Sequence, residues 1–303
     1  MSVEVCAVGD VNVDLVTSPV SDFPPRDGQV VVEDVTLTTG GCAANFARAI
    51  SKLGAKTRLF AKLGNDIFGD FVRKDLEGVD LQFADGKKTG VTLAVTFEDQ
   101  CRSFFTYPGG NSEFRLEDVN FSLLEGKFLH TASHALTSMS RDTIELMKKA
   151  QAKGLKVSYD PGPNPLGVDE KDRKEVLEII SNTDFLFLNQ KEADDYIGLK
   201  GADEIADYVL GFGVEVFVLK MGKKGCTVFF EEGKEAIPPF KVENVVDTTG
   251  AGDVFDAGFI YGQLQDWDVL KSGRFAAACA AISIQSPGNT GYPDPKTVED
   301  FLS

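Results

Sequence analysis

The stretch "VVDTTGAGDVFDAGF", residues 245–259, contains the residues best suited to do chemistry. An apolar segment leads into Gly250-Ala251-Gly252, and the residues that follow are typical of a helix. Small residues let a ligand approach the backbone, and the free N–H groups at the start of a helix bind anions such as phosphate. Asp253 follows directly, and its negative charge would repel a phosphate that is only bound there.

The carboxylate beside this anion site makes chemical sense if the anion reacts. In phosphoryl transfer, the attacking hydroxyl loses its proton as it approaches the terminal phosphate. Asp253 could accept that proton, while the amides of Gly250, Ala251 and Gly252 would stabilise charge on the transferring group. The pattern therefore predicts Asp253 as a catalytic base. A plain tight turn before a helix is the structural alternative, because two glycines at this spacing are common in turns.

Two other phosphate-binding motifs do not fit this chain. A dinucleotide fingerprint, G-x-G-x-x-G, would require glycine where Phe255 stands. The phosphate loop G-x-x-x-x-G-K-[ST] is absent as well, because Gly86-Lys87-Lys88-Thr89 lacks its spacing and the strand before it. The anion site at residues 250–252 is therefore of another type.

The elements that must position these residues alternate between strands and helices. From about residue 128, apolar strands and amphipathic helices follow one another strictly, which predicts a parallel sheet with helices on both faces. Two pairs of half-exposed strands, near residues 11–39 and 88–110, fall outside this rhythm. We therefore expect a three-layer α/β/α fold with a mostly parallel central sheet and a small additional sheet.

Composition limits the partners of the protein. The chain has 303 residues, 43% of them hydrophobic, which is enough for a large core. It carries 31 basic and 47 acidic residues, a formal net charge of -16, so it should repel nucleic acids and anionic membranes. A small molecule is the expected partner.

The cysteines and the N-terminus indicate the cellular compartment. The five cysteines are scattered without C-x-x-C pairs, so neither a disulfide framework nor a zinc site is expected. Residues 1–9 do not resemble a secretory signal, and no apolar run approaches the length of a membrane span. We expect a cytoplasmic protein.

Four stretches of the chain resemble, in order and spacing, the motifs of the pfkB-type carbohydrate kinases of the ribokinase-like superfamily. They are "GGCAANFARAISKLGA" (40–55), "NQKE" (189–192), "VLKMGKKGC" (218–226) and "DTTGAGDVFDAGF" (247–259). The resemblance implies a single ribokinase-like kinase domain over residues 1–303. In that fold, the strand pairs near 11–39 and 88–110 would form a small β lid that shields the reaction from water.

The resemblance implies roles for the residues at matching positions. Asp253 would be the base, and the amides of Gly250, Ala251 and Gly252 the anion hole. Asp14 would accept hydrogen bonds from two adjacent hydroxyls of the substrate, since a carboxylate has two oxygens. The full set on the sugar side is Asn12, Asp14, Gly40, Gly41, Asn45, Arg102 and Tyr107.

The nucleotide side follows from the same resemblance, with ATP as the phosphoryl donor. Asn189 and Glu192 would organise Mg²⁺ and its waters near the phosphates, because Mg²⁺ prefers to stay largely hydrated. Lys220, Gly222 and Gly225 would line the nucleotide. Asp247 resembles a residue of the monovalent-cation loop of some members, which makes it a candidate ligand for K⁺.

Several of these residues have a structural alternative. Asp14 could end a strand at the surface, and Glu192 could only complement the dipole of a short helix. Arg102 could be an ordinary surface charge of the lid, where Phe104 and Tyr107 could simply pack. For His130 and His134, we expect partly buried structural side chains and no catalytic role.

The predicted reaction is transfer of the terminal phosphoryl group of ATP to a hydroxyl, a primary CH₂OH, of a sugar or sugar-like molecule. Ribokinases proper carry a lysine where Cys42 stands, so ribose is not implied as the acceptor. A nucleoside kinase on the same fold is the main alternative, and a non-catalytic sugar-binding or regulatory protein is another. Lid strands of the family often pair between subunits, so a homodimer through the lid is a further expectation.

Overall fold

The computed structural model describes residues 2–99, 101–133, 139–164, 167–287 and 290–303. Within these residues, nine strands form one main sheet. Their order is β13 (Gly233–Ile237), β12 (Cys226–Phe230), β11 (Val216–Lys220), β10 (Phe185–Asn189), β9 (Lys156–Asp160), β8 (Phe128–Ala132), β1 (Val5–Val8), β4 (Thr57–Gly64) and β5 (Asp80–Gly86). Neighbouring strands run parallel except at one edge, where β12 is antiparallel to both of its neighbours, β11 and β13.

Helices cover both faces of the main sheet, because both faces of its central strands are apolar. In β1, Val5 and Ala7 point into one hydrophobic cluster and Cys6 and Val8 into the other, and all four are buried. The first cluster includes side chains of α1 (Cys42–Lys52), α2 (Ile67–Asp75), α7 (Ala251–Leu264), α8 (Val269–Ser283) and α9 (Pro295–Leu302). The second includes side chains of α3 (Ser140–Ala152), α4 (Glu170–Ile180) and α6 (Ala202–Leu210). The predicted three-layer α/β/α architecture is confirmed.

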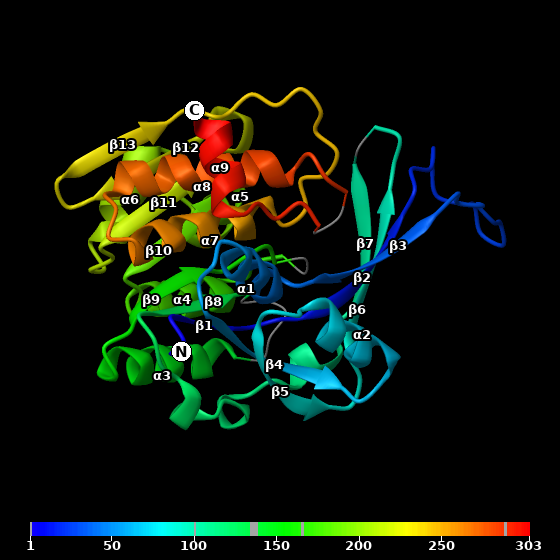
Figure 1. Cartoon of the computed structure of the whole chain (residues 1–303), viewed down its shortest axis with the longest axis horizontal. Helices are drawn as coiled ribbons and strands as arrows, with labels where there is room; N and C mark the ends of the chain where they lie inside the picture. Colours follow the sequence, from blue (N-terminus) through cyan, green and yellow to red (C-terminus); the bar gives the residue numbers. More distant parts are fainter. Residues whose placement is uncertain (1, 100, 134–138, 165–166, 288–289) are drawn as a thin grey trace.

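A second sheet, called the lid sheet below, projects from one side of the main sheet (Figure 1). It is built from the two segments that break the strand–helix rhythm of the sequence. Its strands, in spatial order, are β3 (Val35–Gly40), β2 (Asn12–Thr17), β6 (Gly90–Thr96) and β7 (Arg102–Tyr107). The first of its strands along the chain, β2, is separated from β1 only by residues 9–11. The base of the lid sheet is therefore fixed to the carboxyl end of a central strand.

The register of the lid sheet gives it a polar and an apolar face. Side chains alternate along a strand, so residues that are in register share a face. One face carries a row of polar side chains in register, namely Thr38, Asp14, Thr92 and Thr106. The opposite face carries a row of large apolar side chains, namely Leu37, Leu15, Leu93 and Phe105.

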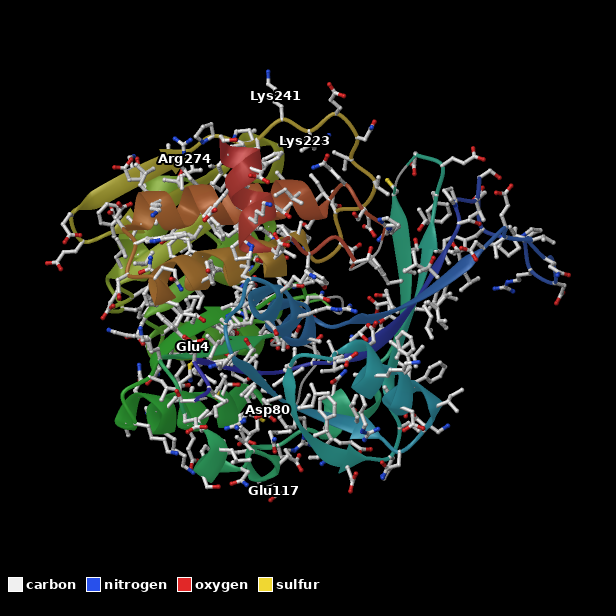
Figure 2. All side chains as sticks on the ribbon, viewed as in Figure 1. Glu4, Asp80, Glu117, Lys223, Lys241 and Arg274 are labelled. Atoms are coloured by element: carbon white, nitrogen blue, oxygen red, sulfur yellow. The ribbon has the colours of Figure 1, made fainter. Side chains whose placement is uncertain are left out.

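Charged side chains cover the outside of the molecule. Figure 2 shows Glu117, Lys223 and Lys241 at its periphery, and all three are exposed. Among the helices of the described residues, none is both long enough and apolar enough to cross a membrane.

Candidate active site

Polar side chains meet at the carboxyl ends of the parallel strands, and the predicted residues Asn189, Lys220 and Asp253 are among them. Asp10 follows β1 closely, and Asp160, Asn189 and Lys220 are the last residues of β9, β10 and β11. These strand ends share one edge of the sheet, which is where ligands bind in open α/β folds. The first turn of α7 brings Asp253 to the same edge, since Gly252 borders Lys220.

Asp253 is a buried carboxylate with a raised affinity for protons. It is 8% exposed and follows Gly250, whose φ of 71° favours glycine. Burial raises the pKa of Asp253 to about 8, although the hydrogen bond from Asn45 acts to lower it. In that bond, Asn45 Nδ2 donates to Asp253 Oδ2 over 2.7 Å. A carboxylate with such a pKa can take up a proton near neutral pH, as a general base must.

The backbone at residues 250–252 forms the start of a helix beside a cation. Because α7 begins at Ala251, the N–H groups of its first turn have no partner within the helix. One of them, the Ala251 N–H, donates to the carbonyl of Thr248 over 3.3 Å. A Cβ at Gly252 would lie 3.3 Å from Lys220 Nζ. The first amides of α7 and the ammonium group of Lys220 therefore both lie next to Gly252, and this arrangement suits the binding of an anion.

Lys220 is buried between two carboxylates that the sequence reasoning missed. Its Nζ lies 2.6 Å from Asp160 Oδ2 and 3.0 Å from Asp256 Oδ1. Burial acts to lower the pKa of Lys220, but the two carboxylates raise it well above its usual value. Two signals could have found the partners: Asp160 ends the apolar strand "KVSYD", and Asp256 lies one helical turn after Asp253. Lys220 thus lies beside the anion site, and its contact with the nucleotide stays a prediction.

Asp14 and Asn12 lie at the base of the lid sheet. Burial raises the pKa of Asp14 to about 7, and the neighbouring Asp10 adds to the rise. Asn12 is buried, and its Oδ1 accepts a hydrogen bond of 2.7 Å from Asn111 Nδ2. A Cβ at Gly40 would lie 2.0 Å from Asp14 Oδ2. A larger residue at position 40 would overlap the carboxylate of Asp14, so glycine is required there.

The second residue of the glycine pair is constrained by its backbone. Gly41 has a φ of 99°, and a Cβ there would lie 2.6 Å from the carbonyl oxygen of Asp10. The Gly41 carbonyl accepts the backbone N–H of Asn45 in the first turn of α1. The pair thus connects the lid sheet to α1 and fixes Asn45 near Asp253.

Arg102 and Asp247 form an ion pair between the lid sheet and the loop before α7. Arg102 Nη1 lies 2.7 Å from Asp247 Oδ1, and it also donates to the hydroxyl of Thr249. The same carboxylate oxygen accepts the backbone N–H of Thr249 over 2.8 Å. Asp247, the predicted candidate ligand for K⁺, therefore has a guanidinium as a cationic neighbour in this structure.

Tyr107, predicted as a substrate-binding residue, lies on the face of the lid sheet opposite to Asp14. Thr106 is in register with Thr92, and Thr92 with Asp14, so these three share the polar face. Tyr107 follows Thr106 and lies on the apolar face, 52% exposed. Phe104 is the aromatic residue of β7 that shares the face of Asp14.

Asn189 and Glu192 bind each other at the end of β10, where α5 (Gln190–Glu192) begins. The backbone N–H and Nδ2 of Asn189 donate to the two oxygens of Glu192 over 2.8 and 2.6 Å. The Glu192 N–H returns a hydrogen bond of 2.9 Å to Asn189 Oδ1. Burial raises the pKa of Glu192 to about 7, and the charge of Asp160 adds to the rise. This carboxylate is thus buried and held in one orientation.

These side chains fit Mg²⁺ that is held through water. Within the part of the chain that the structure describes, no three acidic, histidine or cysteine side chains converge as a metal cage. The Glu192 oxygens have lone pairs beyond those used by Asn189, and Mg²⁺ keeps several waters in most protein sites. Glu192 can therefore accept a hydrogen bond from a metal-bound water.

The turn after β11 carries Gly222 and Gly225 at the rim of the same edge. Both glycines have a positive φ, 53° and 84°. A Cβ at Gly225 would lie 2.1 Å from the carbonyl oxygen of Ile237 in β13. The positive φ angles of this turn and its close approach to the β12–β13 hairpin explain why glycine stands at both positions.

His130 has the structural role that was expected. It is buried, its Nδ1 lies 2.9 Å from Ser158 Oγ, and its ring stacks on Phe46 at 3.7 Å. Burial lowers the pKa of His130 to about 3, so the ring is neutral. His134 lies outside the described residues.

Two further polar residues at this edge were not foreseen. Asp10 is 1% exposed, and its Oδ1 accepts the Ala43 N–H over 3.2 Å. Asn111 accepts the N–H of Val11 over 3.0 Å and donates to Asn12. Asp10 follows the apolar strand directly in the sequence, a position that could have singled it out, whereas Asn111 gives no such signal.

Comparison with known proteins supports a shared fold and family over nearly the whole chain. The sequence pattern of the pfkB family carbohydrate kinases matches residues 3–296. An ATP-dependent ribose-1-phosphate kinase of Halopiger xanaduensis is 32% identical over 308 residues, covering 99% of this chain and 98% of that protein. A nucleoside kinase of Methanocaldococcus jannaschii is 28% identical over 291 residues, covering 94% and 91%.

Solved structures give the same result in three dimensions. A ribokinase of Thermotoga maritima matches with a TM-score of 0.86 and 27% identity over 99% of both chains. The nucleoside kinase structure of Methanocaldococcus jannaschii matches with a TM-score of 0.82 and 27% identity, covering 99% of this chain and 97% of that one. The chain thus has the ribokinase fold.

Proposed function

The chain belongs to the pfkB family of carbohydrate kinases, and on that premise we propose a reaction for it. In this reaction, the terminal phosphoryl group of ATP passes to a hydroxyl, a primary CH₂OH, of a sugar or sugar-like molecule. Asp253 is the catalytic base. The observation that carries the proposal is the position of Asp253, a buried carboxylate in the first turn of α7, one residue from the Gly252 that borders Lys220.

Each step of the transfer has a residue suited to it. Asp253 accepts the proton of the acceptor hydroxyl while the hydroxyl oxygen attacks the terminal phosphorus of ATP; the bond from that phosphorus to the bridging oxygen breaks, and ADP leaves. The first amides of α7 and the Lys220 ammonium stabilise negative charge on the transferring group. Asp14 and Asn12 orient other hydroxyls of the acceptor.

The donor side is proposed to use ATP with Mg²⁺. When bound, Mg²⁺ neutralises charge on the phosphates of the donor. Glu192, oriented by Asn189, would accept hydrogen bonds from its waters. A monovalent cation near Asp247 is a further proposal, and there it would share the carboxylate with Arg102.

A nucleoside is the second acceptor class that an observation favours. The relative from Methanocaldococcus jannaschii is named a nucleoside kinase. Phe104 is 56% exposed and shares the polar face of the lid sheet with Asp14, so its ring could stack on a base. The relative from Halopiger xanaduensis, which is named for ribose 1-phosphate, adds sugar phosphates to the acceptors worth testing.

We also propose a homodimer through the lid sheet. Its apolar row exposes Leu37 at 39% and Phe105 at 59%, and apolar rows of this kind are typical of surfaces that pair with another chain. The occupant is a second copy of this chain, in which the same row offers a matching surface.

A phosphorylation screen tests the proposed function. Sugars, sugar phosphates, polyols and nucleosides are each incubated with ATP, with Mg²⁺ or with chelator, and with or without K⁺. We expect Mg²⁺-dependent transfer to one acceptor class, with the new phosphate on a primary hydroxyl when the product is examined by NMR. Transfer to none of these alcohols, or a phosphate on a secondary hydroxyl, would contradict the proposal.

A further inference from the structure

Asp253 is the end of a chain of hydrogen bonds that runs away from the anion site. Asn45 Nδ2 donates to Asp253 Oδ2 over 2.7 Å. On its other side, Asn45 Oδ1 accepts the hydroxyl of Tyr292 over 3.1 Å. The residues come from the start of α7, from α1 and from the segment before α9, so they are brought together only by the fold.

Arg48 packs its guanidinium against the ring of Tyr292. It lies one helical turn after Asn45, with its guanidinium carbon 5.4 Å from the centre of the Tyr292 ring. Burial raises the pKa of Tyr292, and a hydrogen bond from Arg48 is among the influences that lower it. An ionised Asp253 carboxylate can only accept, so Asn45 must turn its NH₂ group to Asp253, and its amide oxygen accepts the Tyr292 hydroxyl.

The far end of the chain is anchored to the lid sheet. Arg48 Nη2 lies 2.8 Å from Asp75 Oδ2. The same Asp75 oxygen accepts the backbone N–H of Thr39, in β3, over 3.3 Å. Tyr292 is therefore held between a fixed cation and the amide that contacts the base.

We infer that Tyr292 is a positioning residue for the catalytic base: its hydroxyl fixes the amide of Asn45 so that Asn45 donates to Asp253. This inference rests on the proposed role of Asp253. It also gives Asn45 a second task besides contact with the sugar. Without the Tyr292 hydroxyl, the Asn45 amide is free to rotate and present its oxygen to the carboxylate, which would oppose ionisation.

The charges around Asp253 determine what a pH profile can show. Asp10, Asp160 and Cys42 face it from the ends of β1 and β9 and from the start of α1, and Lys220 faces it from β11. Within α7, Asp256 lies one turn further and pairs with Lys220. None of these groups changes when the Tyr292 hydroxyl is removed, so a shift of the profile would report on the Tyr292–Asn45–Asp253 contact.

The test compares Tyr292→Phe with Tyr261→Phe. The first removes the hydroxyl and keeps the ring; the second removes a hydroxyl from α7, where the ring stacks on Phe275 at 5.5 Å. Losing one hydrogen bond to a charged network should lower kcat of Tyr292→Phe about three- to tenfold near neutral pH. The sugar KM should stay within about twofold, since the interaction acts on the base. Tyr261→Phe should behave like the wild type.

The pH profile distinguishes positioning from a structural role. The hydrogen bond from Asn45 favours the ionised carboxylate, so its weakening raises the pKa of Asp253. The acid limb of kcat should therefore move to higher pH by about half a unit to one unit in Tyr292→Phe. In an Asn45→Ala background, Tyr292→Phe should have no further effect, because the group through which it acts is gone.

Three results would overturn the inference. They are an unmoved pH profile in Tyr292→Phe, equal profiles in the two tyrosine variants, and effects that add in the Asn45→Ala background. An Asp253→Asn variant separates this failure from that of the proposed function. If Asp253→Asn retains turnover, the proposed base is wrong; if it loses turnover while Tyr292→Phe has a normal profile, only the positioning role is wrong.

Discussion

Asp253 and Lys220 both lie beside Gly252, and their surroundings explain how a carboxyl group and an ammonium group can both be present at an anion site. The ammonium group of Lys220 forms ion pairs with Asp160 and Asp256, so it can stay protonated although little of it is exposed. Asp253 has only the amide of Asn45 as its hydrogen-bond partner among the described side chains, so burial raises its pKa to about 8. When Asp253 takes up the proton of the acceptor hydroxyl, it loses its negative charge and therefore no longer repels the phosphate.

This arrangement predicts that the ionised carboxylate of Asp253 lowers the free energy of unfolding. The pKa of Asp253 is about 8 in the folded chain and about 3.9 for an unperturbed aspartate, so the folded state binds the proton more tightly. Stability is therefore lost as pH rises from about 4 towards 8. Asn does not titrate, so Asp253→Asn should raise Tm by at least about 2 °C at pH 8, with a smaller gain at pH 5.

Thermal unfolding followed by circular dichroism at both pH values measures this effect. The matched control is Asp207→Asn on the exposed surface of α6, which should leave Tm nearly unchanged. A Tm of Asp253→Asn below that of the wild type at pH 8 would contradict the idea of a destabilising base.

Among single residues, the sequence allowed site residues to be predicted where they follow a clear local pattern. Asp253 was predicted because a carboxylate next to an anion-binding turn demands a chemical reason, and the structure places it in the first turn of α7. The sequence could not give the face of Tyr107, because the face depends on register, and register is set by pairing with β6. Tyr292 gave no signal at all, since its partner Asn45 is 247 residues away in the chain.

The elements behave as their hydrophobic patterns predict, and the lid sheet is the informative case. The main sheet needs helices on both faces because its central strands are apolar on both faces. The lid sheet alternates instead, with polar side chains on the face of Asp14 and apolar ones on the other. The alternation was visible in the sequence, whereas the pairing order β3-β2-β6-β7 was not.

The apolar row of the lid sheet makes a prediction about assembly. Phe105 is the most exposed member of that row at 59%, so a charge there should prevent burial against a second chain. Phe105→Lys should be a monomer in sedimentation velocity at a concentration where the wild type is a dimer. Tyr208→Lys, an exposed aromatic residue on α6, serves as the control and should remain a dimer. A monomeric wild type, or a dimeric Phe105→Lys, would show that this face does not pair.

On the scale of the whole molecule, a strongly acidic chain must bind a polyphosphate through local groups. The net charge is -16, and acids also gather at the active-site edge. The groups that favour an anion there are the amides of α7 and the ammonium of Lys220, with the Arg102–Asp247 pair joining the lid sheet to the same loop. Composition predicted the absence of nucleic acid and membrane as partners, but only the fold shows which cation stands at the anion site.

The most direct measurement of the central claim is turnover by Asp253→Asn with the acceptor found in the screen, together with acceptor affinity by calorimetry. Asn has nearly the same shape and cannot take up a proton at neutral pH. We expect kcat to fall by about 10²- to 10⁴-fold, the usual contribution of a general base, while the acceptor Kd stays within about threefold. Turnover near that of the wild type would contradict the assignment of Asp253 as the catalytic base.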